Sequence, residues 1–224
     1  MAELLDGPRW GPATGGAPRK LVVLLHGLGA DGFDLIDLAP GWGAAVPEAA
    51  FVAPHAPEPC DMAPFGRQWF SVQDRTPARM LAGMRIAAAH LGAFLDAETV
   101  RLGLVAGDVA LMGFSQGAMT ALFTGLRRDP PHAAILAYSG RLVGPEVLAA
   151  ELASRPPVLL VHGEADDVVP VEGSREAERL LREAGVPVES VYRPGLAHGL
   201  DEAGITLGAL TLQRRLAGLE GRPA

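Results

Sequence analysis

Short apolar runs that alternate with longer helical stretches are the feature that most constrains the fold of this chain. The clearest run, Leu-Val-Val-Leu-Leu at residues 21–25, leaves no polar side chain for a solvent-facing side. Runs of this kind are typical of strands that are buried on both faces of a parallel sheet. We expect strands at 20–25, 50–53, 108–114, 133–139, 157–162 and 186–192, and helices at 34–39, 77–97, 116–128, 172–184 and 200–216. The alternation predicts the α/β class, with a mostly parallel central sheet covered by helices on both faces.

The length of the chain indicates how many domains to expect. It has 224 residues, of which 49% are hydrophobic, and this is enough to fill one sizeable core. We therefore expect a single domain over residues 1–224. Residues 1–19 are rich in Gly and Pro and predict an irregular lead-in with at most one short edge strand. Residues 54–76 form a long predicted loop, and such loops are usually functional or disordered.

Charge and cysteine content limit the classes of partner. The formal net charge of −7 argues against nucleic acid, because phosphate binding requires clustered Lys and Arg. No apolar run approaches the ~20 residues of a membrane span, and the start carries acids where a signal peptide carries basic residues. Cys60 is the only cysteine, so an internal disulfide is excluded and a cytoplasmic location is expected. The histidines are dispersed without metal-ligand spacing, so no metal or other cofactor is expected.

A serine motif occupies the junction between the strand expected at 108–114 and the helix expected at 116–128. Residues 113–117 read Gly-Phe-Ser-Gln-Gly, which has the form G-x-S-x-G. In this motif a sharp turn lifts the serine above the sheet. The alternative is that Ser115 only caps the helix, but the strand–turn–helix context favours a nucleophile. The backbone N–H of Gln116, which follows the serine, is then expected to help bind an oxyanion.

A serine nucleophile requires a base, and His198 is the preferred candidate. In hydrolases with this serine motif the chain order is serine, acid, histidine. His198 lies in a Gly-flanked loop between the last expected strand and the last expected helix. His162 ends a strand before the candidate acids and therefore breaks the order. We expect His162, and likewise His26 at the end of an earlier strand, to be structural.

The acid that orients the base is expected in the loop after residue 162, which reads Gly-Glu-Ala-Asp-Asp-Val-Val-Pro. Glu164, Asp166 and Asp167 all compete for this role. Spacing alone does not separate the two adjacent aspartates. One of them would orient the imidazole, and the other would begin a turn or cap a helix.

Four motifs together resemble the carboxylesterase/phospholipase family of α/β-hydrolases, to which acyl-protein thioesterases belong. They are His-Gly-Leu-Gly at 26–29, Gly-Phe-Ser-Gln-Gly at 113–117, His-Gly-x-x-Asp-x-Val-Val-Pro at 162–170 and Gly-x-x-His at 195–198. In this resemblance the acid falls on Asp166, although many relatives have Pro where this chain has Asp167. The resemblance also places the second oxyanion N–H at Leu28.

The segment at residues 65–70 is similar to the aromatic substrate-side segment of the same family. The resemblance therefore implies that Trp69 and Phe70 line a substrate pocket. Packing of Trp69 in the core is the alternative interpretation, because buried aromatic rings contribute much of the apolar area of a core.

The residues and the resemblance imply a serine carboxylesterase that hydrolyses a small-molecule ester through an acyl-enzyme intermediate, without a cofactor. An acyl thioesterase or a lysophospholipase with the same triad is the nearest alternative, since these enzymes differ in leaving group and acyl chain. A non-catalytic binding protein on the hydrolase scaffold is a third interpretation. We expect a monomer or a homodimer.

Overall fold

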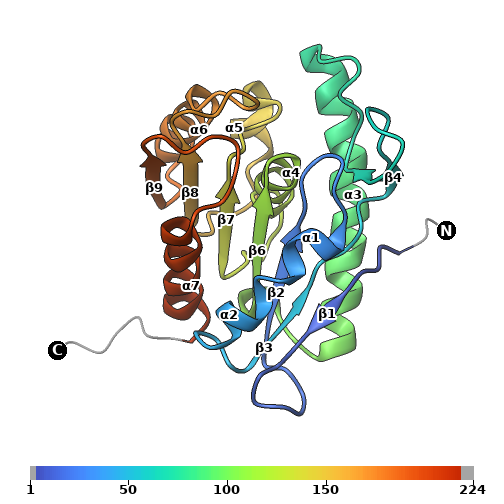
Figure 1. The fold of residues 1–224 in the computed structure, drawn as a ribbon, viewed down its shortest axis with the longest axis vertical. Helices are drawn as coiled ribbons and strands as arrows, with labels where there is room; N and C mark the ends of the chain where they lie inside the picture. The colour runs from blue at the N-terminus through green and yellow to red at the C-terminus, as the bar shows by residue number, and fades with distance from the viewer. Residues whose placement is uncertain (1–3, 218–224) are drawn as a thin grey trace.

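The computed structural model describes residues 4–217, which are organised around one seven-stranded sheet (Figure 1). The strand order is β1-β3-β2-β6-β7-β8-β9, and every neighbouring pair is parallel except β1 and β3. The strands are β1 Arg9–Trp10, β2 Lys20–Leu25, β3 Ala49–Val52, β6 Val109–Phe114, β7 Ala134–Tyr138, β8 Val158–Gly163 and β9 Val188–Arg193. The predicted α/β class with a mostly parallel sheet is confirmed. Ligand sites of such sheets lie beyond the carboxyl ends of the strands.

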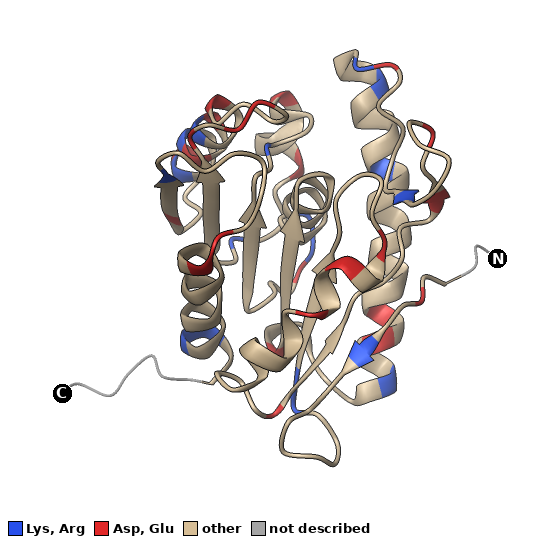
Figure 2. Cartoon of the chain, viewed as in Figure 1, with Lys and Arg blue, Asp and Glu red and all other residues tan. Residues whose placement is uncertain are grey.

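Helices cover both faces of the sheet, and β2 shows why its sequence is apolar throughout. Leu21 and Leu25 belong to the core that α3, α4 and α6 cover, whereas Val22 and Leu24 belong to the core that α2 and α7 cover. Figure 2 shows the central strands β6, β7 and β8 without charged residues, which lie on the surrounding helices and loops and on outer strands such as β1 and β9. The helices are α1 Gly32–Ile36, α2 Ala39–Gly43, α3 Pro77–Leu102, α4 Gln116–Gly125, α5 Leu148–Glu151, α6 Glu172–Glu183 and α7 Glu202–Leu216, with 3₁₀ turns η1 Ala106–Asp108 and η2 Pro145–Val147.

Several predicted elements have different ends. The helix expected at 34–39 is instead two short helices, α1 and α2, and Pro40 lies in the first turn of α2. A proline is tolerated there because the missing N–H would have no acceptor within the helix. Helix α3 continues beyond 97 to Leu102 and is capped by Gly103, whose φ of 67° suits a glycine. Helix α4 stops at Gly125 rather than at 128.

The long loop predicted at 54–76 contains a small antiparallel pair of strands, β4 Glu58–Pro59 and β5 Arg67–Gln68. Backbone hydrogen bonds join this pair to the loop after β2. The N–H of Gly29 donates to the carbonyl of Arg67 at 2.9 Å, and the N–H of Arg67 donates to the carbonyl of Ala30 at 2.8 Å. The two loops therefore form one connected unit at the carboxyl edge of the sheet.

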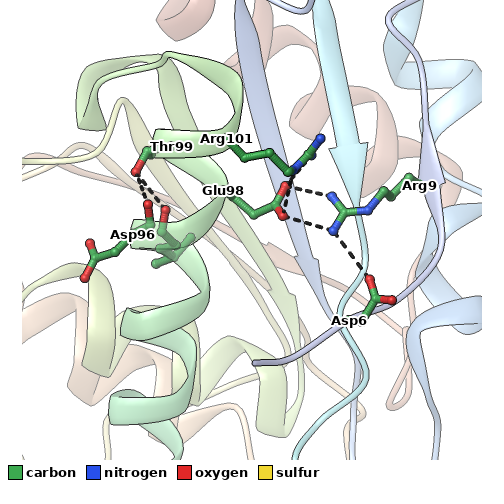
Figure 3. A network of polar contacts seen from close by, with 7 residues as sticks. Asp6, Arg9, Asp96, Glu98, Thr99 and Arg101 are labelled. Atoms are coloured by element: carbon green, nitrogen blue, oxygen red, sulfur yellow. Dashed lines mark hydrogen bonds and ion pairs between the residues drawn. The ribbon is translucent and has the colours of Figure 1, made fainter. Parts of the chain in front are cut away.

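A cluster of charged residues ties the edge strand β1 to α3 (Figure 3). Arg9 donates to the two oxygens of Glu98 at 2.7 and 2.9 Å, and Arg101 donates to the same carboxylate at 2.6 Å. Burial raises the pKa of the Glu98 carboxyl, but the hydrogen bonds from Arg101 and Arg9 outweigh it and hold the pKa below its ordinary value. The short edge strand of the lead-in is thus fixed through side chains as well as through the sheet.

Within residues 4–217, no helix has both the length and the apolar character that a bilayer crossing requires. That residues 1–224 form a single domain stays a prediction. The two ends of that range and the first part of the lead-in, residues 1–3 and 218–224, lie outside the described residues.

Candidate active site

Ser115 lies at the turn between β6 and α4, at the carboxyl edge of the sheet. Its φ of 54° and ψ of −117° fall in a region that residues other than glycine rarely adopt. A Cβ at Gly113 would lie 2.3 Å from the backbone of Gly117, and one at Gly117 would lie 1.9 Å from the carbonyl oxygen of Leu25. Packing therefore requires both glycines of the motif. The N–H of Ser115 donates to the carbonyl of Tyr138 at 2.8 Å, which anchors the turn to β7.

His198 lies between Ser115 and Asp166. Its Nε2 is 3.0 Å from the Oγ of Ser115, and its Nδ1 is 2.7 Å from Oδ2 of Asp166. Because an ionised carboxylate can only accept a hydrogen bond, Nδ1 carries the ring proton, and Nε2 can accept the proton of the serine hydroxyl. The three side chains come from the loops after β6, β8 and β9, so the parallel sheet brings together residues that are far apart in the sequence.

The Asp166 side chain is fully buried, and both of its oxygens accept hydrogen bonds. Oδ1 accepts the N–H groups of Val168 at 2.9 Å and Val169 at 2.8 Å, while Oδ2 faces His198. Burial raises the pKa of the Asp166 carboxyl, but the hydrogen bonds from His198, Val169 and Val168 outweigh it and hold the pKa below its ordinary value. The carboxyl is therefore ionised at neutral pH, as an acid that orients a histidine base has to be.

The other two candidate acids point elsewhere. Glu164 is exposed and pairs with Arg175 at 2.9 Å. Asp167 is exposed and forms no hydrogen bond or ion pair within the described part of the chain. The expectation that the two adjacent aspartates divide the tasks of orienting the imidazole and forming the turn is wrong. Asp166 does both, because each of its oxygens serves one task.

His162, which we expected to be structural, also contacts Asp166. Its Nε2 is 3.1 Å from Oδ2 of Asp166 and 2.8 Å from the carbonyl oxygen of Val169, while its Nδ1 is 2.6 Å from the Oγ of Ser174. Both neighbours of Nε2 can only accept, so Nε2 carries the proton. The sequence did not predict this contact, since His162 precedes Asp166 by four positions on the other side of a turn. His162 therefore positions the carboxylate from the buried side.

Leu28 and Gln116, whose backbone N–H groups are the expected oxyanion donors, both line the cavity that Ser115 borders. Gln116 is the first residue of α4, so its N–H has no acceptor within the helix. The loop of Leu28 is fixed by His26, whose Nδ1 donates to the carbonyl of Gly27 at 2.7 Å and whose Nε2 accepts from Ala56 at 3.0 Å. Burial lowers the pKa of His26 to about 4, so the ring is neutral at neutral pH.

A cavity of about 470 Å³ borders Ser115 and His198. Most of its wall is apolar, as expected of a site that binds a carbon chain. Two arginines also reach it. Apart from Ser115, His198 and the two candidate oxyanion residues, the wall consists of Phe70, Val72, Arg75, Met80, Met119, Arg141, Val168, Val169, Pro170 and Gly173.

Comparison with known proteins identifies the family. Residues 13–207 match the model of the phospholipase/carboxylesterase family. The chain belongs to this family. It is 30% identical to acyl-protein thioesterase 1 of Neurospora crassa over 79% of each protein. It is 31% identical to esterase YpfH of Escherichia coli over 82% of this chain and 77% of that protein.

The crystal structure of esterase PE8 shares 45% sequence identity with the chain. It superposes with a TM-score of 0.91 and covers 96% of this chain and 100% of its own. The predicted family and the α/β-hydrolase fold are thereby confirmed. As a member of the phospholipase/carboxylesterase family, the chain is a serine hydrolase of carboxylic esters.

The two aromatic residues expected in the pocket of this carboxylesterase differ in position. Both rings are 1% exposed, but Phe70 lines the cavity, whereas Trp69 is not part of the cavity wall. The indole N–H of Trp69 donates to the carbonyl of His26 at 2.9 Å, and its backbone N–H donates to the side chain of Gln116 at 2.8 Å. The expectation for Trp69 is therefore corrected. It holds the loop of Leu28 and the start of α4 together from within the core.

Within residues 4–217, no group of three or more His, Cys, Asp and Glu side chains is arranged to hold a metal ion. The polar groups around Ser115 are those of acyl transfer: a hydroxyl, an imidazole, a carboxylate and backbone N–H donors.

Proposed function

We propose that this carboxylesterase hydrolyses its substrate through an acyl-enzyme intermediate formed on Ser115, with His198 as general base and Asp166 as the orienting acid. The observation that supports these roles is the hydrogen-bonded series in which His198 lies 3.0 Å from Ser115 and 2.7 Å from Asp166. Such a series activates a hydroxyl that is otherwise a weak nucleophile.

Acylation follows from this geometry. The Oγ of Ser115 attacks the ester carbonyl carbon while its proton passes to Nε2 of His198. The resulting imidazolium is stabilised by the ionised carboxylate of Asp166, which stays charged because its pKa lies below the ordinary value. The C–O bond to the leaving group then breaks, and Nε2 returns the proton to the departing alkoxide.

Deacylation repeats these steps with water. Water attacks the acyl-enzyme carbonyl and gives a proton to Nε2 of His198, and the proton returns to the Oγ of Ser115 as the carboxylic acid leaves. In both halves the N–H groups of Leu28 and Gln116 would hold the negative oxygen. Their positions are preorganised by the hydrogen bonds of His26 and Trp69, so little reorganisation accompanies the reaction.

The substrate is a small-molecule ester, and the apolar wall of the cavity supports an acyl chain as the group bound there. A thioester or a lysophospholipid is the alternative substrate, because the same nucleophile, base and oxyanion donors act on either. We further propose a cytoplasmic monomer or homodimer. The cytoplasmic location is supported by the single cysteine, Cys60, which is buried and forms no disulfide.

A fluorophosphonate probe and a short-chain ester together test the proposal. Wild-type protein should be labelled at one serine and should hydrolyse the ester, and Ser115→Ala should abolish both. Ser154→Ala is the matched control. Ser154 lies just before β8, at the amino ends of the strands and therefore away from Ser115. Its hydroxyl is buried and has no hydrogen-bond partner among the described residues. Wild-type protein that is neither labelled nor active would favour a non-catalytic binding protein, and residual labelling of Ser115→Ala would move the nucleophile elsewhere.

A further inference from the structure

A second cavity of about 270 Å³ adjoins the active-site cavity. Four residues line both spaces: Arg75, Met80, Arg141 and Gly173. The stem of Arg141 lies against α6, since a Cβ at Gly173 would be 2.9 Å from its Cβ and 3.4 Å from its Cδ. Arg75 and Arg141 are both exposed and both line the two cavities, so these arginines lie where the cavities adjoin, within a largely apolar wall.

These two arginines differ from most others in their partners. Elsewhere in residues 4–217 arginines are commonly held by carboxylates, as Arg179 is held by Glu176 at 2.6 Å. Arg75 donates only to the carbonyl of Val72, at 3.3 Å, and Arg141 forms no hydrogen bond or ion pair in the described structure. In a chain of net charge −7, two cations without carboxylate partners beside the catalytic serine indicate a site for a negatively charged group.

Two carboxylates border the second cavity and limit where an anion would bind. Glu176 is already paired with Arg179, so its charge is largely compensated. Glu146 lines the second cavity but not the first. An anion is therefore favoured at the junction, next to Arg75 and Arg141, rather than deep in the second cavity. A guanidinium binds carboxylates and phosphates through paired N–H groups, which gives both charge and direction to the contact.

We propose that the enzyme selects esters that carry an anionic group, a carboxylate or a phosphate, which Arg75 and Arg141 bind while the ester carbonyl lies at Ser115. This inference rests on the proposed function, because it assigns the substrate class of the same site. The apolar wall then holds the carbon chain between the two polar ends of the substrate.

The test compares pairs of substrates with the same carbon chain, in which one member carries an anionic group and the other a neutral group at the same position. Monomethyl suberate and dimethyl suberate form the carboxylate arm. A 1-acylglycerol 3-phosphate and the 1-acylglycerol with the same acyl chain form the phosphate arm. In at least one arm, wild-type enzyme should have the higher kcat/KM for the anionic member. The Arg75→Met/Arg141→Met double variant should lower the anionic-to-neutral ratio by about tenfold or more, and added salt should lower the wild-type ratio.

Arg155→Met is the matched control. Arg155 is exposed, lies just before β8 at the amino ends of the strands, and donates to the carbonyl of Ala184. This variant should keep the wild-type ratio. Wild-type enzyme that hydrolyses the neutral esters without preferring the anionic ones would overturn the inference, as would a ratio that the double variant leaves unchanged. Failure to hydrolyse any of the four esters would instead overturn the proposed function. The arm that shows the effect identifies carboxylate or phosphate as the group recognised.

Discussion

Two histidines contact the same oxygen of Asp166, and their surroundings differ. His198 follows β9, is 16% exposed at its side chain, and directs Nε2 to the hydroxyl of Ser115. His162 ends β8, is fully buried, and directs Nε2 to the carbonyl of Val169 and Nδ1 to the hydroxyl of Ser174. One ring faces the cavity, and the other faces the interior between β8 and α6.

The difference shows that the group contacted by Nε2 besides Asp166, or in its place, determines what each histidine can do. The hydroxyl of Ser115 can give up a proton to Nε2 of His198, whereas the carbonyl of Val169 has none to give to His162. We therefore propose that the shared carboxylate supports chemistry on the side of His198 and structure on the side of His162. Replacing either ring should separate these two contributions.

The largest effect is expected from Asp166→Asn, which removes the charge that both histidines face. The amide can stabilise the tautomer of His198 that has its proton toward Ser115, so kcat should fall by about 10⁴-fold. Steady-state kinetics measure this loss. Glu164→Gln, in the same loop but exposed and paired with Arg175, should leave kcat unchanged. A loss no greater than about tenfold in Asp166→Asn would remove the acid from its proposed role.

A third histidine at the same edge of the sheet extends the comparison to pH. Burial lowers the pKa of His26 from 6.5 to about 4. Between pH 6.5 and 4, His26 is therefore mostly protonated in the unfolded chain and mostly neutral in the folded chain. Stability should therefore fall as pH falls from 6.5 to 4, by on the order of 3 kcal/mol from this group.

Denaturant melts of wild type and His26→Asn across this pH range isolate the contribution of His26. The variant should be less stable at neutral pH, because it loses the hydrogen bond that His26 accepts from Ala56. Its stability should also depend less steeply on pH. The buried His132, whose pKa burial likewise lowers to about 4, contributes equally to both proteins. Equal slopes in the two proteins would contradict the prediction.

A smaller effect on stability should distinguish the two rings that face Asp166. His162→Asn loses contacts to Asp166, Val169 and Ser174, so the free energy of unfolding should fall by about 2 kcal/mol. Its kcat should fall far less than that of His198→Asn, which should keep near-normal stability. Urea melts and steady-state kinetics on both variants check this. If His162→Asn lost activity as fully as His198→Asn while remaining stable, His162 would belong to the catalytic series.

The smallest effect is expected from Asp167→Asn. Asp167 is exposed and has no partner among the described residues, while its neighbour Asp166 accepts both N–H groups of the turn. Stability should therefore change by no more than about 0.5 kcal/mol, with kcat unchanged. A thermal melt with a kinetic assay is sufficient. A clear loss of kcat would transfer part of the role of Asp166 to its neighbour.

The sequence predicted six strands of the large sheet to within two residues at each end, mostly because a short continuous apolar run indicates a buried strand. The run at 20–25 is β2 without change, and the serine motif lies between β6 and α4 as expected. Local patterns are sufficient for these features, since strand burial and a tight glycine turn depend on neighbouring residues.

The walls of the site could not be predicted in the same way. Met119 on α4 and Arg141 in the loop after β7 both line the cavity, and these two segments pack against each other, since a Cβ at Gly140 would lie 2.6 Å from the Cβ of Ala118. No local sequence pattern marks that contact. Trp69 and Phe70 are adjacent in an irregular segment, so sequence alone does not determine which ring faces the cavity. Likewise, the contact of His162 with Asp166 depends on how the turn between them folds.

The two outermost strands of the sheet, β1 and β9, affect how copies of this chain behave at high concentration. At one edge β1 pairs with β3 at only two positions, and Arg9 is held there by Glu98. At the other edge, β9 carries Glu189 and Arg193, which pair with Arg214 at 2.9 Å and Asp201 at 2.8 Å. Short or charged edge strands are poor templates for a strand from another molecule. The mostly parallel sheet is thus protected at both sides against edge-to-edge polymerisation, and the protein should resist aggregation at high concentration.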